Sequence, residues 1–356
     1  MSRSAQNSGT IEVREAHRFD VARLEAFMAS EVEGFAGPLA VEQFRGGQSN
    51  PTYKLSTPAR SYVLRRKPPG KLLPGAHAVD REYRVIEALG RQSFPVAQAV
   101  ALCLDESVIG TAFYIMEMVE GRIFWDPTFP QVAADERPAY FDAMNATIAA
   151  LHMIDPVAAG LGDYGKPGNY FTRQIGRWSR QYAEDVDAGR IGSMDRLVEW
   201  LPLNIPADAG EGRIIHGDYR CDNMIFHPAE PRVLAVLDWE LSTLGHPLAD
   251  FSYHLMMYRM PAAITSGLEG LDLAGLNIPS EEEYVAAYCA RTKRDGIPDL
   301  DFYIAFNMFR LAAIIHGIKG RIARGTAASA HADKMAASLE PLADLAWQQA
   351  KRAGAS

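Results

Sequence analysis

The chain has few cysteines and no long apolar run, and each shortage excludes a class of protein. Its 356 residues include three cysteines, Cys103, Cys221 and Cys289, which are far apart in the sequence. An odd number at this spacing predicts neither a disulfide framework nor a zinc site, and it favours a reducing cytoplasmic location. No apolar run is long enough to predict a membrane span, and the polar start of the chain does not predict a secretory signal.

The chain also lacks an excess of positive charge. Its formal net charge is −8 and its pI is about 5.6, so neither a broad nucleic-acid-binding surface nor an acidic membrane as partner is expected. Hydrophobic residues make up 48% and charged residues 22% of the chain, which is enough for a sizeable core. The length favours two domains or one domain in two lobes, and the oligomeric state is not predicted.

Apolar periodicity divides the chain into a β-rich part and a helical part. Residues 1–18 are expected to form a flexible tail. The next elements are predicted as helices at 19–35 and 78–90 and strands at 41–44, 53–55, 62–64, 100–104 and 112–118. The later elements are predicted as helices at 137–152, 170–188, 247–258, 280–291, 300–324 and 331–352, with short strands near 214–215, 224–226 and 233–237. We therefore expect an α+β fold in two lobes, 19–118 and 119–356.

One segment of the second lobe places three oxygen-bearing side chains at short spacing. Asp218, in His216-Gly217-Asp218, follows a short apolar strand, Asn223 comes five residues later, and Asp238 ends the next apolar run. Phosphoryl transfer from a nucleotide needs a carboxylate that orients the attacking hydroxyl, and amide and carboxylate oxygens that hold Mg²⁺. The alternatives are a Gly-Asp turn and a turn-capping aspartate, but the combined spacing favours the catalytic interpretation.

The sequences HGDYRCDN and VLDWE resemble those of the aminoglycoside phosphotransferase and choline kinase family, which has a two-lobed protein-kinase-like fold. The resemblance implies a kinase that uses ATP and Mg²⁺ to phosphorylate a hydroxyl of a small molecule. It implies Asp218 as the catalytic base and Asn223 and Asp238 as Mg²⁺ ligands. Arg220 stands where protein kinases carry a lysine that contacts the transferred phosphate, and Asp250 resembles the structural aspartate that braces the catalytic loop.

The first lobe offers residues for nucleotide binding. Gly46, Gly47, Ser49 and Asn50 lie between two predicted strands, where backbone N–H groups can approach phosphate oxygens; an ordinary hairpin is the alternative. Kinase chemistry next needs a cation on the third strand and a carboxylate on the following helix.

For that pair we select Arg65 and Glu82. Strand alternation puts Arg65 and Lys67 on one face and predicts that Arg66 points outward, so the choice among the three basic residues stays open. Choline-kinase-like members also carry arginine at this position.

The segment from Tyr114 to Gly121 resembles the kinase hinge. The resemblance implies that Met116 lines the adenine pocket and that backbone groups near Glu117 and Val119 bind the base. The alternative is an ordinary buried strand with Met116 in the core.

The segments YVLRRKPPGKLLPGAHAVDREYRVIEAL and FRLAAIIHGIKGRIARG resemble the kinase-like domain that is fused to acyl-CoA dehydrogenases in animals. This implies a hydroxyacyl-CoA or hydroxy acid as the small-molecule acceptor. An aminoglycoside or a choline-like amino alcohol is the alternative, and it would need an acidic cleft, for which only 281–283 offers a cluster. Arg310, Lys319 and Arg321 would suit an anion better. An inactive nucleotide-binding pseudokinase is a further alternative, although the five motif residues are all present.

Overall fold

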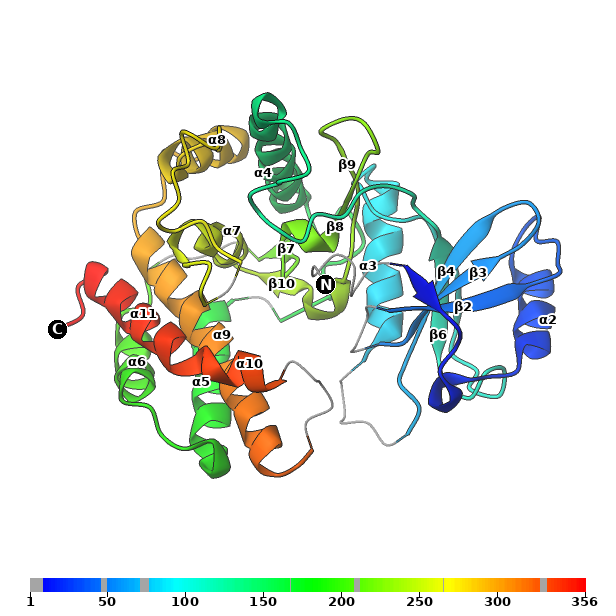
Figure 1. Cartoon of the computed structure of the whole chain (residues 1–356), viewed down its shortest axis with the longest axis horizontal. Helices are drawn as coiled ribbons and strands as arrows, with labels where there is room; N and C mark the ends of the chain where they lie inside the picture. The colour runs from blue at the N-terminus through cyan, green and yellow to red at the C-terminus, as the bar shows by residue number, and fades with distance from the viewer. Residues whose placement is uncertain are drawn as a thin grey trace. The chain divides into compact units, whose positions relative to one another are not determined.

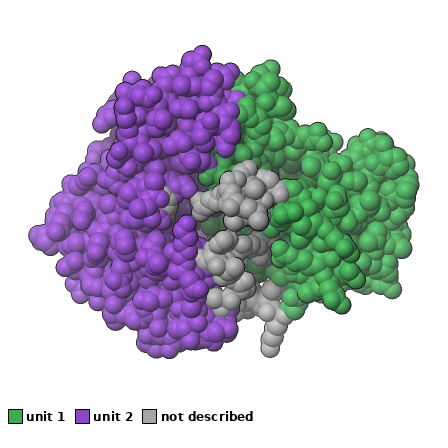
Figure 2. Space-filling model, viewed as in Figure 1, with its two compact units in different colours: residues 1–125, 156–164, 221–242 green, residues 126–155, 165–220, 243–356 purple. Residues whose placement is uncertain are grey.

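The computed structural model describes residues 9–45, 50–70, 77–166, 168–207, 212–264, 266–326 and 332–356. The chain forms two compact units, which Figure 2 shows in different colours. Unit 1 contains residues 1–125, 156–164 and 221–242, and unit 2 contains residues 126–155, 165–220 and 243–356. The division at residues 19 and 119 stays a prediction, because each unit is assembled from several stretches of chain.

Unit 1 is built on a six-stranded antiparallel sheet with the order β1-β2-β3-β4-β6-β5. Its strands are β1 (Thr10–Ile11), β2 (Ala40–Phe44), β3 (Thr52–Ser56), β4 (Ser61–Arg66), β5 (Ala99–Cys103) and β6 (Phe113–Glu117). The strands from β2 to β6 confirm the expected ones. Strand β1 and the 3-10 helix η1 (Glu15–His17) lie in the stretch that was expected to be a tail.

Two helices pack on this sheet. Helix α2 (Val21–Glu31) buries Leu24 and Met28 against the face that carries Leu64 and Phe113. Helix α3 (Val79–Arg91) contacts β5 and β6. The two helices lie on opposite sides of the sheet (Figure 1). Because successive side chains of a strand point to opposite faces, Arg65 of β4 lies on the face opposite Leu64, where it pairs with Glu82 of α3.

The remaining part of unit 1 is a hairpin of β8 (Met224–Phe226) and β9 (Val233–Val236). The 3-10 helix η4 (Cys221–Asn223) precedes the hairpin and η5 (Trp239–Leu241) follows it. Phe226 also forms a backbone bridge to Arg122. The hairpin therefore places the two ends that carry the predicted metal ligands next to each other.

Unit 2 is helical. Its helices are α4 (Arg137–Met153), α5 (Tyr170–Glu184), α6 (Gly192–Leu203), α7 (Pro247–Leu255), α8 (Glu281–Thr292), α9 (Leu300–Ala323), α10 (Ala332–Ala337) and α11 (Leu339–Arg352). Shorter 3-10 helices are η2 (Ala134–Glu136), η3 (Val186–Ala188) and η6 (Met256–Arg259). Helix α9 packs against α5, α7, α10 and α11, as Figure 1 shows, and it is buried on most of its circumference.

A two-stranded antiparallel sheet of β7 (Arg213–Ile215) and β10 (Thr243–Gly245) completes unit 2. Strand β7 leads directly into the His216-Gly217-Asp218 motif. Within the described ranges, no helix has the length and apolar character needed to cross a membrane. The predicted α+β composition, with strands first and helices later, is confirmed.

Candidate active site

The side chains of Arg65 and Glu82 form a buried ion pair in unit 1. The Nε of Arg65 lies 2.9 Å from the Oε2 of Glu82, and the two side chains are 11% and 2% exposed. The alternation of β4 presents Arg65 toward α3, and Glu82 lies in the first turn of that helix. The structure therefore forms the cation–carboxylate pair that was expected from the kinase pattern.

The other two basic residues beside Arg65 differ in their surroundings. Arg66 lies on the opposite face of β4, where its guanidinium donates to the carbonyl oxygens of His17 and Ile109, both at 3.1 Å. The prediction that Arg66 points outward is wrong, because η1 and α2 cover that face and leave the side chain 2% exposed. Lys67 follows the strand and is half-buried.

Glu82 accepts further hydrogen bonds from two buried side chains. The Nδ2 of Asn50 donates at 2.9 Å and the hydroxyl of Tyr114 donates at 3.1 Å. Burial raises the pKa of Glu82 to about 7, against the lowering effect of Arg65. The Oδ1 of Asn50 is 2.8 Å from the Nδ1 of His77. The side chain of Asn50, expected near phosphate, thus holds Glu82 in place.

The β8–β9 hairpin brings Asn223 and Asp238 to neighbouring positions. Met224 pairs with Val236, and the backbone N–H of Leu237 donates to the carbonyl oxygen of Asn223 at 2.8 Å. Asp238 adopts a left-handed backbone conformation, with φ 65° and ψ 60°. This region is uncommon for a residue other than glycine, although aspartate adopts it more readily than most, and such residues often occur at functional sites.

Trp239 supports the left-handed conformation of Asp238. Its side chain is buried, its ring N–H donates to the carbonyl oxygen of Val236 at 2.9 Å, and it packs edge-on against Phe94. The side chain of Asp238 remains 34% exposed, and its Oδ1 lies 2.7 Å from the Nη2 of Arg65. Unit 1 thus presents the carboxylate of Asp238 beside the buried guanidinium of Arg65, and Asn223 lies next to Asp238 at the base of the hairpin.

Glu240 joins this arrangement, and the sequence reasoning gave it no role. Its Oε2 lies 3.3 Å from the Nη2 of Arg65. Glu82, Asp238 and Glu240 together raise the pKa of Arg65 and outweigh the opposing effect of its burial. The sequence feature that could have identified Glu240 is its position two residues after Asp238, in the same turn.

Contacts of residues 160–164 fix helix α3 to this site. Arg81 donates to the carbonyl oxygen of Tyr164 at 2.8 Å and stacks over its ring at 4.3 Å. The hydroxyls of Tyr164 and Ser242 are 2.7 Å apart, and Ser242 donates to the carbonyl oxygen of Trp239. Arg84 pairs with Asp163. The helix that carries Glu82 is therefore tied to the turn that follows Asp238.

In unit 2, the predicted catalytic loop is braced from helix α7. The carboxylate of Asp250 accepts the backbone N–H groups of His216 and Gly217 at 2.8 and 2.7 Å. Burial works to raise the pKa of Asp250, but hydrogen bonds and electrostatic attraction from His152 and His216 outweigh it and lower the pKa. Gly217 has φ +86°, which favours glycine. The structural role predicted for Asp250 is confirmed.

Asp218 comes directly after this braced turn. Its Oδ1 accepts a hydrogen bond from the hydroxyl of Tyr253 at 2.5 Å, and the Nε of Arg220 lies 3.4 Å away. The side chain of Asp218 is 22% exposed and that of Arg220 is 50% exposed. Sequence reasoning missed Tyr253, although its place three residues after Asp250 puts it on the same face of α7.

The remaining predicted nucleotide-binding residues fall into two groups. Gly46, Gly47 and Ser49 lie outside the described residues. Met116 and Glu117 end strand β6 and Val119 follows it, all half-buried, and the N–H of Glu117 donates to the carbonyl oxygen of Gln98 at 2.9 Å. Their contact with adenine stays a prediction.

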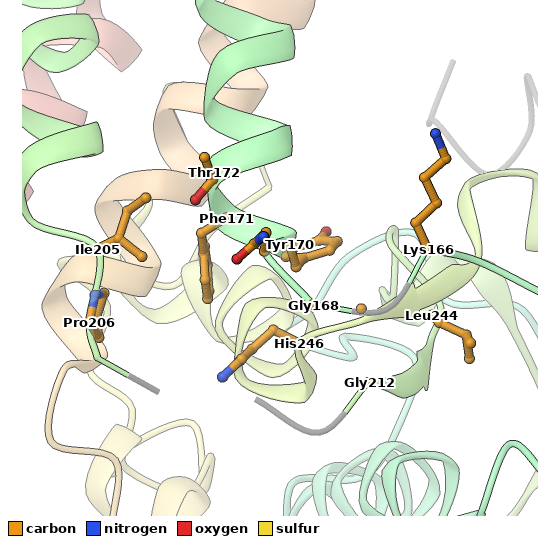
Figure 3. Close-up of a pocket in the computed structure, with 12 residues that line it drawn as sticks. Lys166, Gly168, Tyr170, Phe171, Thr172, Ile205, Pro206, Gly212, Leu244 and His246 are labelled. Carbon is orange, nitrogen blue, oxygen red and sulfur yellow. The ribbon is translucent and has the colours of Figure 1, made fainter. Parts of the chain in front are cut away.

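Unit 2 also contains a cavity of about 270 Å³ at the start of α5. Ile205 and Pro206 lie on one side of it and Phe171 and His246 on another, and Lys166 is at the far end of the lining (Figure 3). The other lining residues are Gly168, Asn169, Tyr170, Thr172, Gly212, Leu244 and Gly245. The lining is therefore part apolar and part basic.

Unit 1 contains an aspartate beside a buried Arg–Glu pair, and unit 2 contains a braced His-Gly-Asp loop. Both features are typical of a kinase-like phosphotransferase. Comparison with known proteins agrees. Residues 40–303 match the model of the phosphotransferase enzyme family (APH), and the chain belongs to this family of ATP-dependent phosphotransferases. The predicted family is confirmed.

Individual relatives show the same relationship. The chain is 44% identical over 356 residues to acyl-CoA dehydrogenase family member 11 of Gallus gallus. The match covers 98% of this chain and 46% of the relative. The chain thus spans about half the length of that protein. A crystal structure of a candidate aminoglycoside phosphotransferase from Ralstonia eutropha is 54% identical, with a TM-score of 0.87 over 94% of this chain and 99% of that one.

A more distant structure shows the fold alone. It is an aminoglycoside phosphotransferase in complex with ADP and hygromycin B, 14% identical, with a TM-score of 0.60 over 94% of this chain and 99% of that one. The kinase-like fold, with an antiparallel sheet first and a helical part after it, is therefore confirmed.

Proposed function

We propose that this chain transfers the γ-phosphoryl group of Mg²⁺-bound ATP to a hydroxyl of an acyl substrate, either a hydroxyacyl-CoA or a hydroxy acid. The observation that carries the proposal is the arrangement around Arg65, which pairs with buried Glu82 and lies 2.7 Å from Asp238. A carboxylate held beside a buried cation–carboxylate pair is what phosphoryl transfer from a nucleotide requires, and this supports an active enzyme over an inactive nucleotide-binding protein.

In this proposal, Asn223 and Asp238 hold Mg²⁺, and Arg65 contacts the phosphates. The donor chemistry fits, because Mg²⁺ prefers carboxylate and amide oxygens and the hairpin brings one of each together. Bound Mg²⁺ supplies positive charge to the phosphates. That a related fold binds ADP supports ATP as the nucleotide.

Asp218 is proposed as the base, because it precedes Asn223 by five positions, the spacing of the H-G-D-x-x-x-x-N motif. Its carboxylate orients the acceptor hydroxyl and receives its proton late in the transfer. Arg220, whose Nε lies 3.4 Å from the same carboxylate, is proposed to contact the transferred phosphate. The remaining nucleotide contacts are proposed as Gly46, Gly47, Ser49, Met116, Glu117 and Val119, together with the backbone of Asn50, whose side chain is bonded to Glu82.

The contacts of the acidic residues 281–283 support an acyl acceptor over a polycationic one. Glu281 pairs with Arg259, with its two carboxylate oxygens at 2.9 and 3.0 Å from Nε. Glu283 closes the capping box at the start of α8 with Ser280. Two of the three acidic residues are thus committed to structural contacts.

Three further observations point the same way. The lining of the cavity adds Lys166 to apolar side chains, which suits a ligand with an acyl part and an anionic part. Arg310 is buried and donates to the carbonyl oxygen of Gly217 at 2.9 Å, so it adds positive charge beside the catalytic loop. The relationship to an acyl-CoA dehydrogenase family member supports the same class of substrate.

The test is an ADP-release assay with Mg²⁺ and ATP over a panel of acceptors. The panel contains hydroxyacyl-CoAs with the hydroxyl at different carbons, the corresponding free hydroxy acids, choline, ethanolamine and an aminoglycoside. Asp218→Asn and Asp238→Ala are compared with the matched control Asp295→Asn, which changes an exposed aspartate. We expect a hydroxyacyl compound to give the highest turnover, and Asp218→Asn to lower it by about 10²–10⁴-fold.

Two results would contradict the proposal. A kinase would be excluded if no acceptor raised the turnover of the wild type above that of Asp218→Asn and Asp238→Ala and if the protein did not bind ATP. Preferred phosphorylation of choline or of the aminoglycoside would establish the alternative acceptor class.

A further inference from the structure

Helix α7 contacts four consecutive residues of the catalytic loop, 216–219. Besides the two bonds from Asp250, the hydroxyl of Tyr253 donates to Asp218 at 2.5 Å. The Nδ1 of His254 lies 3.2 Å from the carbonyl oxygen of Tyr219. Residues 250, 253 and 254 share one helix face, since their spacing is three and four residues. Three of these contacts hold the backbone, and the bond from Tyr253 alone holds the predicted catalytic side chain.

The ring of Tyr253 is itself fixed by a buried cation. The guanidinium carbon of Arg310 lies 5.3 Å from the ring centroid, and its Nη2 donates to the carbonyl oxygen of Gly217. Arg310 is 7% exposed. Its charge therefore acts on the Gly217–Asp218 turn and on the phenol. By contrast, Lys319 is half-buried and Arg321 exposed on the same helix.

Tyr253 is held in its hydrogen-donating form. Burial and the negative charge of Asp218 raise its pKa well above the ordinary value, and the charges of Arg220 and Arg310 oppose this rise without reversing it. A hydrogen bond from a neutral donor to a carboxylate is short and strong, and it favours one rotamer of the acceptor.

We propose that Tyr253 is a positioning residue for phosphoryl transfer, whose hydroxyl fixes the carboxylate of Asp218 in the orientation that receives the acceptor's proton. This inference rests on the proposed role of Asp218 as the base. A carboxylate that is free to rotate samples unproductive geometries, whereas one that is tethered through Oδ1 keeps a constant direction toward the acceptor.

The test compares Tyr253→Phe with Tyr258→Phe. Tyr258 is a matched control, because it is buried one turn beyond α7 and, within the described residues, its hydroxyl has no hydrogen-bond partner. The assay uses the acceptor with the highest turnover in the panel described above. We expect Tyr253→Phe to lower kcat by about 10- to 100-fold, the range of one lost hydrogen bond to a charged group. The KM values for ATP and acceptor should change less than threefold, and Tyr258→Phe should match the wild type.

The split between kcat and KM gives a readout that a merely structural role would not move. The bond from Tyr253 reaches the carboxylate of Asp218 and not the backbone of the loop. Its loss should therefore lower kcat at nearly constant KM, whereas a loosened fold would weaken the binding of ATP and acceptor as well.

Two kinetic outcomes would overturn the inference. An unchanged kcat would show that the bond only contributes to folding. A lower acceptor KM with a higher kcat would show instead that the phenol occupies the acceptor's place and has to leave.

A double-mutant cycle separates this inference from the proposed function. The free energy of unfolding is measured for Asp218→Ala, which removes the accepting oxygen, for Tyr253→Phe and for the double variant, without any substrate. We expect the double variant to lose less stability than the sum of the two single variants. Strict additivity would overturn the inference whether or not an acceptor is found. A non-additive loss of stability in a protein that phosphorylates no acceptor would contradict only the proposed function. In that case Tyr253→Phe and Tyr258→Phe are compared by their rates of ATP hydrolysis in the absence of an acceptor.

Discussion

The buried imidazole of His254 predicts how stability depends on pH. Its Nδ1 lies 3.2 Å from the carbonyl oxygen of Tyr219, which can only accept, so Nδ1 carries the proton. Its Nε2 lies 2.7 Å from the hydroxyl of Tyr284, which donates to it. These two bonds specify the neutral ring. Burial lowers the pKa of His254 from 6.5 to about 4.

The sign and size of the effect follow from this pKa. Above about pH 7 the ring is neutral in both the folded and the unfolded chain, so its protonation makes no difference. Between pH 6.5 and 4 the unfolded chain binds a proton that the folded protein refuses, and stability falls as pH falls. A pKa lower by about 2.5 units corresponds to a loss of about 3 kcal/mol by pH 4, at 1.36 kcal/mol per unit.

Urea unfolding of the wild type and of His254→Gln, at intervals from pH 8.5 to pH 4, measures this loss. The variant lacks the titrating ring and should be the less stable protein at neutral pH, because it loses part of the bonding to Tyr219 and Tyr284. The difference between the two proteins should be constant from pH 7.5 to 8.5 and shrink by about 3 kcal/mol toward pH 4. Circular dichroism and fluorescence have to give coincident transitions for the comparison to hold. A difference that stays constant over the whole range would refute the neutral, buried ring.

Two further predictions concern the catalytic loop held by Asp250 and the close approach of Gly121 to the β8–β9 hairpin. Asp250→Asn replaces a buried carboxylate that accepts two backbone N–H groups, and we expect it to lower the free energy of unfolding by about 2–4 kcal/mol and to reduce turnover; urea unfolding that matches the wild type would contradict this. In Gly121→Ala, the new Cβ would overlap the carbonyl oxygen of Phe226, and thermal unfolding should show a loss of about 1–3 kcal/mol. The control Gly176→Ala adds a Cβ with nothing within 4 Å on helix α5, so it should raise stability by about 0.5–1 kcal/mol.

Apolar periodicity was sufficient to predict a helix or strand where one face of the element is buried. Strand β4 alternates between the α2 face and the α3 face, so the sequence separated Arg65 from Leu64 without any structure. Helix α6 was missed even though Met194, Leu197 and Leu201 recur at helical spacing and are buried. Strand β10 is only three residues long, too short for any alternation to be visible.

For the site, the sequence predicted residues that motifs carry and missed those that depend on tertiary contacts. The pairing of Arg65 with Glu82 was expected from the kinase pattern, and strand alternation favoured Arg65 over Arg66. The contacts of Glu240 with Arg65 and of Tyr253 with Asp218 join residues 175 and 35 positions apart. No local pattern encodes such distances, because they arise only when the hairpin and helix α7 are in place. The burial of Arg66 was missed for the same reason, since η1 and α2 cover its face.

The anchoring of α3 by Tyr164 has a consequence for the control of activity. In protein kinases, displacement of the helix that carries the paired glutamate is a means of turning the enzyme off. Here that displacement would break the bonds of Arg81 to Tyr164, of Tyr164 to Ser242 and of Arg84 to Asp163 at the same time. We therefore expect the resting protein to keep its Arg65–Glu82 pair intact, so that its rate in the cell follows the supply of nucleotide and acceptor rather than a switch at this helix.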